Sequence, residues 1–508
     1  MVYLQTFYGA GHRRQERPCS LMDRISDSGS DDRRSIRLGG TKNNTKTLTM
    51  RKAFLTILAM VLAGTAAFAQ EKEMKTGWSL GVLPSVTYST DNGFQYGAFG
   101  DVYYYGDGNT YPDPLHKFSW EASHYTKGRT RLYLAYDSKY LVPGMRFNAS
   151  VTYVDDPMYN FWGFNGTPAL QNYDLWANKE GAMLHPGLDG NQHGINYYGM
   201  SRKMFRALAN VQGRITDNLN WAAGLNFWNW QMGDMRESSK NENTYDTDVT
   251  LYKRYQEIDA IHSDEAEGGK ALEINAGVVY DTRDIEAAPN KGIWAEAYLN
   301  GNVLDHRYLK ACAYFRHYIT LPVHLFKAGD PVFAYRLAWQ QTIAGETPFY
   351  MIQNVPLLVQ RNMISEGFGS ANTIRGIREN RILTEGFAWA NMELRVKLVS
   401  FKLLNQYFYI AVNPFFDAGI VTKGYREGAF DGFDALGIPK ATDPKLAAFG
   451  ASAAIYDSTK TGDIVTSAGA GLKIAMNQNF IVSVELAHCF YNEMVADPWI
   501  GIGINYQF

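Results

Sequence analysis

The sequence predicts an all-β fold, a single 16-stranded antiparallel transmembrane β-barrel of the outer-membrane type. Three observations support this prediction. Apolar and polar residues alternate with a period of two over most of residues 78–508, as in strands with one apolar and one polar face. The apolar faces are long, aromatic-rich at their ends and opposed by Gly, Asn, Ser and charged residues, which favours a membrane barrel over a soluble β-sandwich. Finally, the strand count is even, and the long and short connections alternate.

The first 69 residues are expected to lie outside this fold. Residues 1–49 are polar and lack hydrophobic periodicity. Either the start codon was assigned too early, or these residues form a disordered extension. Residues 50–69 have the features of a signal peptide, with Arg51 and Lys52 before a short apolar run and a small-residue cleavage site at 67–69. Residues 70–77 would then form a short periplasmic segment, and residues 78–508 the barrel.

The alternation is clearest in four runs. The first run places Trp78, Leu80, Val82, Val86 and Tyr88 on one face and small polar residues on the other. Residues 145–154 and 271–281 alternate in the same way. The last run has an apolar face made of Ile500, Ile502, Ile504, Tyr506 and Phe508. A secreted chain that ends on an aromatic strand is typical of outer-membrane barrels.

Counting such runs in order gives 16 expected strands, at 78–89, 93–106, 117–126, 129–140, 145–154, 201–215, 218–232, 271–281, 292–302, 307–321, 330–342, 384–399, 405–419, 466–476, 479–490 and 498–508. The long connections, at 155–200, 233–270, 343–383 and 420–465, all fall at odd-numbered joins. Even-numbered joins are short. With the N-terminus in the periplasm, the long connections are extracellular, as barrels of this type require.

Charge and cysteine content exclude several classes of function. The first 69 residues hold 11 of the 49 basic and 5 of the 51 acidic residues, which leaves 38 and 46, or a net charge of −8. This balance argues against nucleic-acid binding. Cys312 and Cys489 are far apart and are expected to be free thiols rather than a disulfide.

No enzyme or cofactor is expected either. The histidines lack metal-ligand spacing, and no glycine-rich phosphate loop follows a strand into a helix. An acidic stretch at 431–434 is better explained as a solvated loop than as a calcium site. We therefore predict no catalytic residues, no metal and no cofactor.

The most informative motif is Thr373-Ile374-Arg375-Gly376-Ile377, on a polar stretch between two expected strands. Arg375 precedes Glu393 by 18 residues and Asp417 by 42. Both carboxylates lie on the polar, inward faces of their strands. An arginine on a loop that folds back into the barrel is therefore expected to pair with both.

At these residues the chain resembles the bacterial surface antigen family of outer-membrane assembly factors, which includes BamA and TamA. The loop motif is similar to the family's hydrophobic-Arg-Gly-aromatic signature, although Ile377 replaces the aromatic residue. The stretches 391–395 and 415–419 are similar to the family's patterns on the twelfth and thirteenth strands. Asp281, Arg283 and Asp284, followed by Pro289 and Gly292, are similar to its periplasmic turn between the eighth and ninth strands.

The resemblance implies a barrel that assembles or translocates outer-membrane proteins or lipids, located in the bacterial outer membrane. Its implied partners are outer-membrane lipids, client proteins or lipids, and the barrel assembly machinery for its own insertion. Most relatives carry periplasmic POTRA domains before the barrel. Because the first strand begins near Trp78, we expect a barrel-only member, and a passive pore or structural surface protein is the alternative.

The junction between the first and last strands is the expected site of lateral opening in such a family. Pro84 lies within the first strand and lacks the N–H that a ladder hydrogen bond needs. Phe508 ends the last strand. We therefore expect the first strand to pair less extensively with the sixteenth than with the second. Lumen occupancy distinguishes the two functions, since a plugged barrel conducts poorly and a porin conducts steadily.

Overall fold

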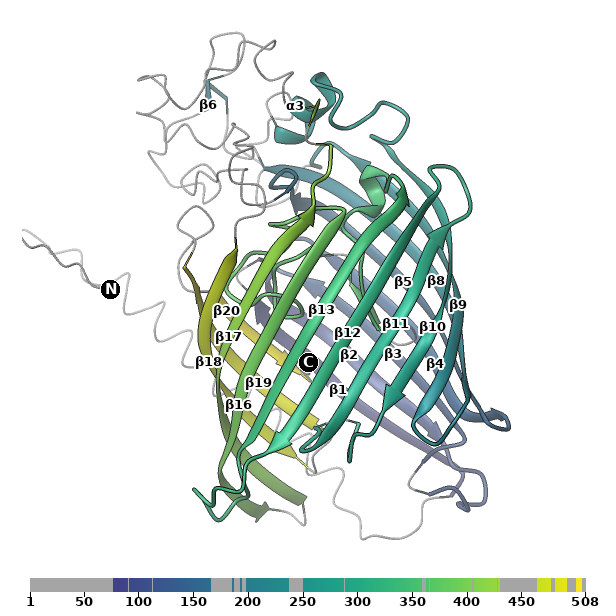
Figure 1. Ribbon diagram of the computed structural model, residues 1–508, viewed down its shortest axis with the longest axis vertical. Helices are drawn as coiled ribbons and strands as arrows, with labels where there is room; N and C mark the ends of the chain where they lie inside the picture. The colour runs from purple at the N-terminus through teal and green to yellow at the C-terminus, as the bar shows by residue number, and fades with distance from the viewer. Residues whose placement is uncertain are drawn as a thin grey trace, which may run out of the picture. The chain divides into compact units, whose positions relative to one another are not determined.

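A computed structural model describes residues 76–89, 91–111, 113–165, 185–186, 192–193, 198–236, 250–286, 288–358, 362–364, 366–403, 406–426, 428–429, 464–476, 480–490 and 499–504. The expected extension at 1–49, the signal peptide at 50–69, the acidic stretch at 431–434 and Phe508 lie outside these residues. The described chain forms one closed antiparallel barrel of 16 strands (Figure 1). The predicted fold class is therefore confirmed.

Each barrel strand pairs with its neighbours in the sequence, and the last described strand pairs with the first. Two further short hairpins lie outside the barrel, β6 (His185–Pro186) with β7 (Gln192–His193), and β14 (Val355–Leu358) with β15 (Asn362–Ile364). The barrel strands are β1 (Trp78–Ser89), β2 (Gly93–Tyr104), β3 (His116–Tyr125), β4 (Thr130–Val142), β5 (Met145–Asn160), β8 (Gly199–Arg214), β9 (Leu219–Gly233), β10 (Gly268–Asp281), β11 (Gly292–Asn302), β12 (Tyr308–Thr320), β13 (Val332–Gly345), β16 (Gly386–Leu403), β17 (Gln406–Lys423), β18 (Val465–Met476), β19 (Phe480–Cys489) and β20 (Trp499–Ile504).

Several strands are longer than the alternation predicted. β5 continues to Asn160, six residues past its expected end, and β17 continues to Lys423. Both extensions lead into long connections, and in both the backbone still pairs with a neighbouring strand. Pairing with the neighbouring strand, rather than side-chain pattern, sets where a strand ends.

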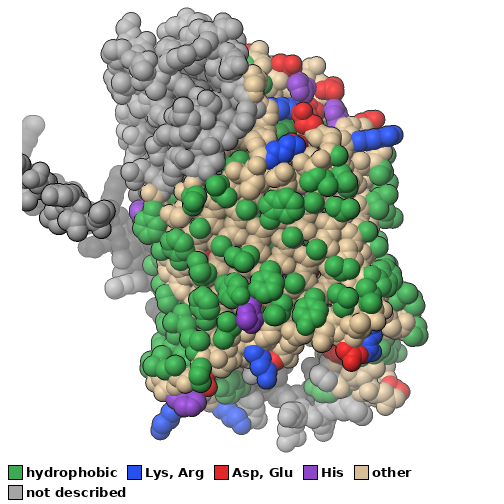
Figure 2. Space-filling model, viewed as in Figure 1, with side chains coloured by type: hydrophobic (Ala, Val, Ile, Leu, Met, Phe, Trp, Pro, Cys, Tyr) green, Lys and Arg blue, Asp and Glu red, His purple; other side chains and the backbone are tan. Residues whose placement is uncertain are grey.

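The two faces of the wall follow the alternation. Large apolar side chains such as Leu134, Ile274, Leu337 and Leu486 are about half exposed on the outside. Figure 2 shows hydrophobic side chains over the wall, with Lys, Arg, Asp and Glu gathered at its two ends. The inward face instead carries buried polar and charged side chains. No helix in the described part of the chain is long and apolar enough to cross a membrane.

The long connections meet at one end of the barrel, called the loop end, and short turns lie at the opposite turn end. At the loop end, aromatic residues from four connections form a buried cluster together with α3 (Leu251–Glu257) and η1 (Phe349–Met351). Its most buried members include Phe161, Trp162, Phe164, Tyr255, Phe349 and Tyr425. This cluster ties the connections together over the barrel mouth.

Candidate functional site: loop six and the barrel junction

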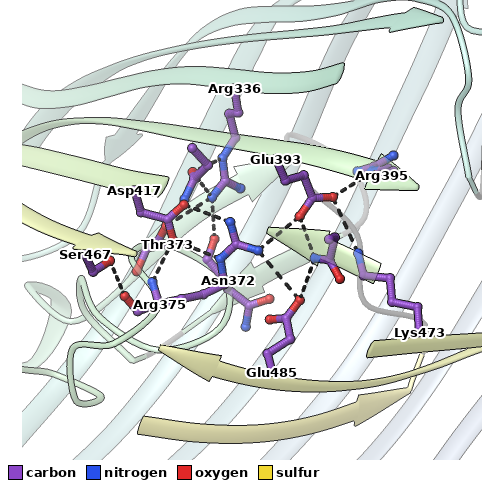
Figure 3. Close-up of polar contacts among 12 residues, drawn as sticks. Arg336, Asn372, Thr373, Arg375, Glu393, Arg395, Asp417, Ser467, Lys473 and Glu485 are labelled. Atoms are coloured by element: carbon purple, nitrogen blue, oxygen red, sulfur yellow. Dashed lines mark hydrogen bonds and ion pairs between the residues drawn. The ribbon is translucent and has the colours of Figure 1, made fainter. Parts of the chain in front are cut away.

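The connection between β13 and β16, residues 346–385, is called loop six. Part of it lies within the barrel outline in Figure 1. Thr373, Arg375 and Ile377 are completely buried, so the predicted motif is inside the protein rather than on a solvent-exposed loop. Figure 3 shows the polar residues that surround it.

Gly376 allows this part of the loop to approach the wall closely. Its φ of +89° lies in the left-handed region that favours glycine. A Cβ at this position would lie 3.1 Å from the Cβ of Ser467 and 3.2 Å from that of Ala487. The backbone therefore passes close to β18 and β19, and the Ser467 hydroxyl donates a hydrogen bond to the Arg375 carbonyl at 2.5 Å.

Arg375 binds Asp417 through three hydrogen bonds. Its Nε donates to Oδ2 at 2.9 Å, its Nη2 donates to Oδ1 at 2.8 Å, and its backbone N–H donates to Oδ2 at 3.0 Å. Two side-chain nitrogens thus bind the two carboxylate oxygens, a bidentate geometry that a planar guanidinium can form and an ammonium cannot. The guanidinium also lies 3.6 Å from the ring centre of Phe415, a cation–π contact that supports the same orientation.

The same guanidinium reaches Glu393, to which Nη1 donates at 3.1 Å. The two contacts that the residue spacing predicted are therefore present in the structure. What they contribute to function remains a prediction. A third carboxylate, Glu485 on β19, lies 3.6 Å from Nη1. Glu485 was not among the residues predicted from the sequence, although it shares the inward face of its strand with Ser483 and alternation alone points it into the lumen.

Two further cations complete the cluster. Arg395 Nε donates to Glu393 Oε1 at 2.6 Å, and Lys473 Nζ lies 3.5 Å from the same oxygen. The cluster thus combines three cations with three carboxylates, and all but Arg395 have less than a tenth of their side chain exposed. Buried charges persist only when paired in this way.

The rest of the motif is held by the neighbouring wall. Asn391 Nδ2 donates to the Thr373 carbonyl at 2.7 Å, and Arg336 Nη2 donates to the Asn372 carbonyl at 2.8 Å. Ile374 and Ile377 are fully buried in a cluster that includes Phe368, Phe387 and Trp389. Ile377 therefore packs in the place where the resemblance led us to expect an aromatic side chain.

The predicted turn motif lies at the turn end, between β10 and β11. Arg283 pairs with Asp281 through two nitrogens, at 2.9 and 2.7 Å, and lies 3.7 Å from the ring centre of Trp294. Asp284 accepts hydrogen bonds from the backbone and side-chain nitrogens of Asn290. Burial acts to raise the pKa of Asp284, but these hydrogen bonds hold it below its ordinary value.

This turn is connected to the Arg375 cluster through β16. Arg395, which binds Glu393, also donates to the Pro289 carbonyl at 3.5 Å. Two residues further on, Lys397 Nζ donates to Asn290 Oδ1 at 3.2 Å. The two motifs are therefore ends of one line of contacts along the inner wall.

The residues just after the motif bind the opposite side of the barrel junction. Glu379 accepts hydrogen bonds from Arg129 Nη2 at 2.5 Å and from Asn92 Nδ2 at 2.6 Å. Arg378 lies 3.4 Å from Asp91. Asp91 and Asn92 lie in the β1–β2 connection, and Arg129 lies in the β3–β4 connection. Loop six therefore joins β16–β19 to β1–β4 from inside, across the β1–β20 junction.

Among the described residues, which end at Ile504, that junction, called the seam, has few pairs. The described pairs between β1 and β20 are two, Tyr88 with Ile502 and Ser89 with Gly501, compared with 12 between β1 and β2. The expected difference between the two sides of β1 is thus present among the described residues. Pro84 pairs with Ala98 of β2 and is in neither seam pair, so its role in the seam remains a prediction.

Among the described residues, no group of three or more His, Cys, Asp or Glu could hold a metal ion. Cys312 and Cys489 are both buried and do not form a disulfide with each other, as expected. The site is a buried cluster of ion pairs that fixes loop six to the barrel wall.

Comparison with known proteins identifies one family that covers most of this chain. The model of the Omp85 superfamily domain matches residues 128–484, which include loop six, Glu393 and Asp417. No curated protein matches the sequence significantly.

Among solved structures, the barrel is similar to BamA from Haemophilus ducreyi lacking POTRA domains 1–3, with 14% identity over 85% of this chain and 70% of that one, and a TM-score of 0.48. It is also similar to CdiB from Escherichia coli, with 9% identity over 83% of this chain and 62% of that one, and a TM-score of 0.47. This chain therefore spans about three-fifths of the length of that CdiB chain.

Proposed function

Because the chain belongs to the Omp85 superfamily, we propose that this outer-membrane barrel accepts client proteins or lipids at its seam, with its N-terminus in the periplasm. The turn end then faces the periplasm and the loop end the cell exterior. The motif residues 373–377, the partners Glu393 and Asp417, and the turn residues Asp281, Arg283 and Asp284 would hold the barrel in its closed state. The proposed clients are outer-membrane proteins or lipids.

One observation carries this proposal, namely that loop six bridges the seam from inside, where the described residues of β1 and β20 form few pairs. β1 has 12 described pairs on one edge and two on the other. Backbone groups without partners in a bilayer cost several kcal/mol each, so opening the seam would favour the addition of another strand to the exposed edge of β1. Loop six holds both sides of this edge together through Arg375 and Glu379, which makes opening conditional on releasing the loop.

The occupied lumen argues against a passive pore. Loop six fills the space beside β16–β19 with fully buried side chains, and the aromatic cluster at the loop end ties four connections together. A porin needs a continuous aqueous path. We therefore expect the purified protein to conduct ions poorly in planar bilayers, whereas steady large conductance would favour the passive pore.

The test is a covalent lock on the seam. Tyr88 and Ile502 are directly paired on the outer face, so cysteines at both positions should form a disulfide under mild oxidation, after Cys312 and Cys489 are replaced by serine. We expect the locked protein to lose its ability to support the levels of other outer-membrane proteins, with recovery on reduction. Cysteines at Leu80 and Val102, paired across β1 and β2, are the matched control. Full activity of the seam-locked protein would refute the proposal.

A further inference from the structure

The connection between β10 and β11 extends across the lumen at the turn end. Its described residues, 282–286 and 288–291, are called the strap. Ala288 of the strap packs against a buried cluster on the inner face of β17, β18 and β19, which consists of Tyr409, Ala411, Ala475 and Ile481. In the barrel order, β19 is six strands away from β11. A turn that only joined two adjacent strands would not reach it.

The base of the strap is fixed to the barrel wall. Arg283 has 2% of its side chain exposed and forms an ion pair with Asp281 at 2.7 Å. The ring centre of Trp294 lies 3.7 Å from the guanidinium of Arg283 and 4.3 Å from that of Arg316. Cation–π contacts of this kind hold the planar groups against one another, so the base does not move freely.

The two arms of the strap are tied together by one carboxylate. Asp284 accepts hydrogen bonds from the backbone and side-chain nitrogens of Asn290, both at 3.0 Å, and from the Lys291 backbone N–H at 3.3 Å. Beyond this tie the described residues form a projecting tip, which consists of Ile285, Glu286, Ala288 and Pro289. The strap is therefore a rigid base that carries a short tip.

The spaces on the two sides of the tip are very unequal. Toward β16–β19 a cavity of about 50 Å³ remains. Toward β4, β5, β8 and β9 the cavity is about 440 Å³, and Arg283 and Glu286 line it. Glu286 reaches Arg146 on β5 at 3.2 Å, but 46% of the Glu286 side chain is exposed, and exposed ion pairs contribute little. The tip is thus closely packed on one side and has room on the other.

The closely packed side lies next to the Arg375 cluster. Three residues that line the smaller cavity also bind Glu393, namely Arg395, Lys473 and Asn413. Arg395 and Lys473 lie on the side of Glu393 away from Arg375 (Figure 3). Arg395 also donates to the Pro289 carbonyl of the strap. The docked strap therefore covers these ion pairs on the side that faces the turn end.

We propose that the strap is a gate at the turn end that controls loop six. Docked on β16–β19, its tip keeps water away from the ion pairs of Glu393. Moved into the larger cavity, it admits water to them, which weakens their attraction and thereby the hold on loop six. The inference rests on the proposed function, to which it adds a control on the release of loop six from the turn end.

The test measures maleimide labelling of single cysteines in the full-length protein in detergent, after Cys312 and Cys489 are replaced by serine. Ala288→Cys reports the position of the strap, and Ser370→Cys, at a buried position, reports loop six.

The perturbation is Asn290→Ala, which removes the side-chain hydrogen bonds with Lys397 and Asp284, neither of which belongs to the Arg375 cluster. We expect labelling of Ala288→Cys to rise about tenfold, as the loss of a hydrogen bond to a charged group predicts. Labelling of Ser370→Cys should rise in parallel.

The matched control is Asn218→Ala, at an exposed asparagine of the neighbouring β8–β9 turn, which should change neither rate. Lys397→Met removes the contact with Asn290 from the wall side and should act in the same direction as Asn290→Ala. The conclusion therefore does not depend on the folding of one variant.

Two results would overturn the inference. Unchanged labelling of Ala288→Cys in both variants would show that the strap is a fixed turn. Faster labelling of Ala288→Cys with unchanged labelling of Ser370→Cys would show that the strap moves without controlling loop six. The proposed function fails by a different result, full activity of the protein locked at Tyr88 and Ile502, which does not depend on the labelling rates.

Discussion

Replacing Arg375 by methionine should release loop six from the wall. Methionine retains an apolar stem over Phe415 but removes every charged contact. Of the three hydrogen bonds from Arg375 to Asp417, only the one from the backbone N–H would remain. Glu393 would retain Arg395 at 2.6 Å and Asn413 at 3.1 Å. The cost therefore falls mainly on Asp417, a completely buried carboxylate left without its cation.

The magnitude follows from that uncompensated charge. Removing one partner of a buried ion pair costs about 3–5 kcal/mol. Each 1.4 kcal/mol changes an equilibrium constant tenfold, so the ratio of released to docked loop should rise by roughly a hundred- to a few thousand-fold. Arg375→Lys should recover only part of this, because an ammonium cannot form the two-nitrogen contact with Asp417.

The assay is maleimide labelling of a cysteine placed at Ser370, which is 8% exposed in the docked loop. Cys312 and Cys489 are first replaced by serine. When docking and release are fast relative to labelling, the labelling rate reports the released fraction. The control is Arg214→Met, which breaks an exposed pair with Asp217 and should leave the rate unchanged, because such pairs contribute about 0–1 kcal/mol.

A labelling rate for Arg375→Met within about threefold of the parent would refute this reasoning. The double variant Arg375→Met with Asp417→Asn provides a second check. If the cost arises from the unpaired carboxylate, the double variant should be less perturbed than the sum of the two single variants, with a coupling of at least about 1.5 kcal/mol. Additive effects would show that Arg375 and Asp417 act independently.

Three further predictions concern Gly376, Glu379 and Lys127. Gly376→Ala should also increase Ser370→Cys labelling, because the added methyl meets Ser467 and Ala487 at 3.1–3.2 Å and φ is +89°; unchanged labelling would mean that the loop shifts freely. Glu379→Gln should weaken the contact with Arg129 and Asn92 and increase protease cleavage in the β1–β2 connection, with Glu286→Gln as the control that should not. Burial lowers the pKa of Lys127 to about 8 from 10.5, so the unfolded chain binds more protons between these values and this group's contribution to the unfolding free energy rises from pH 8 to 10.5. Lys127→Met should remove that rise in urea unfolding measured at pH 8 and at pH 10, and an identical pH profile would exclude Lys127 as its source.

The sequence by itself determined the barrel and the central pair of contacts. Because side chains alternate strictly along a strand, the apolar pattern alone assigns Glu393 and Asp417 to the inward face. The long connection that carries Arg375 lies between two expected strands, so a loop that folds inward meets those carboxylates. These are local properties, and the structure places all three residues together.

Only the tertiary structure decided which residues from distant segments of the chain contact one another. Glu485 and Lys473 reach the cluster because closure brings β18 and β19 beside loop six. Glu379 meets Arg129, 250 residues away, because the loop crosses the seam. The alternation of apolar and polar residues predicts which face of a strand a residue occupies. Which residues on that face contact each other depends on how distant segments are placed in the folded barrel. A cavity of about 200 Å³ behind the seam exists for the same reason, since its walls come from β1, β19, β20 and loop six.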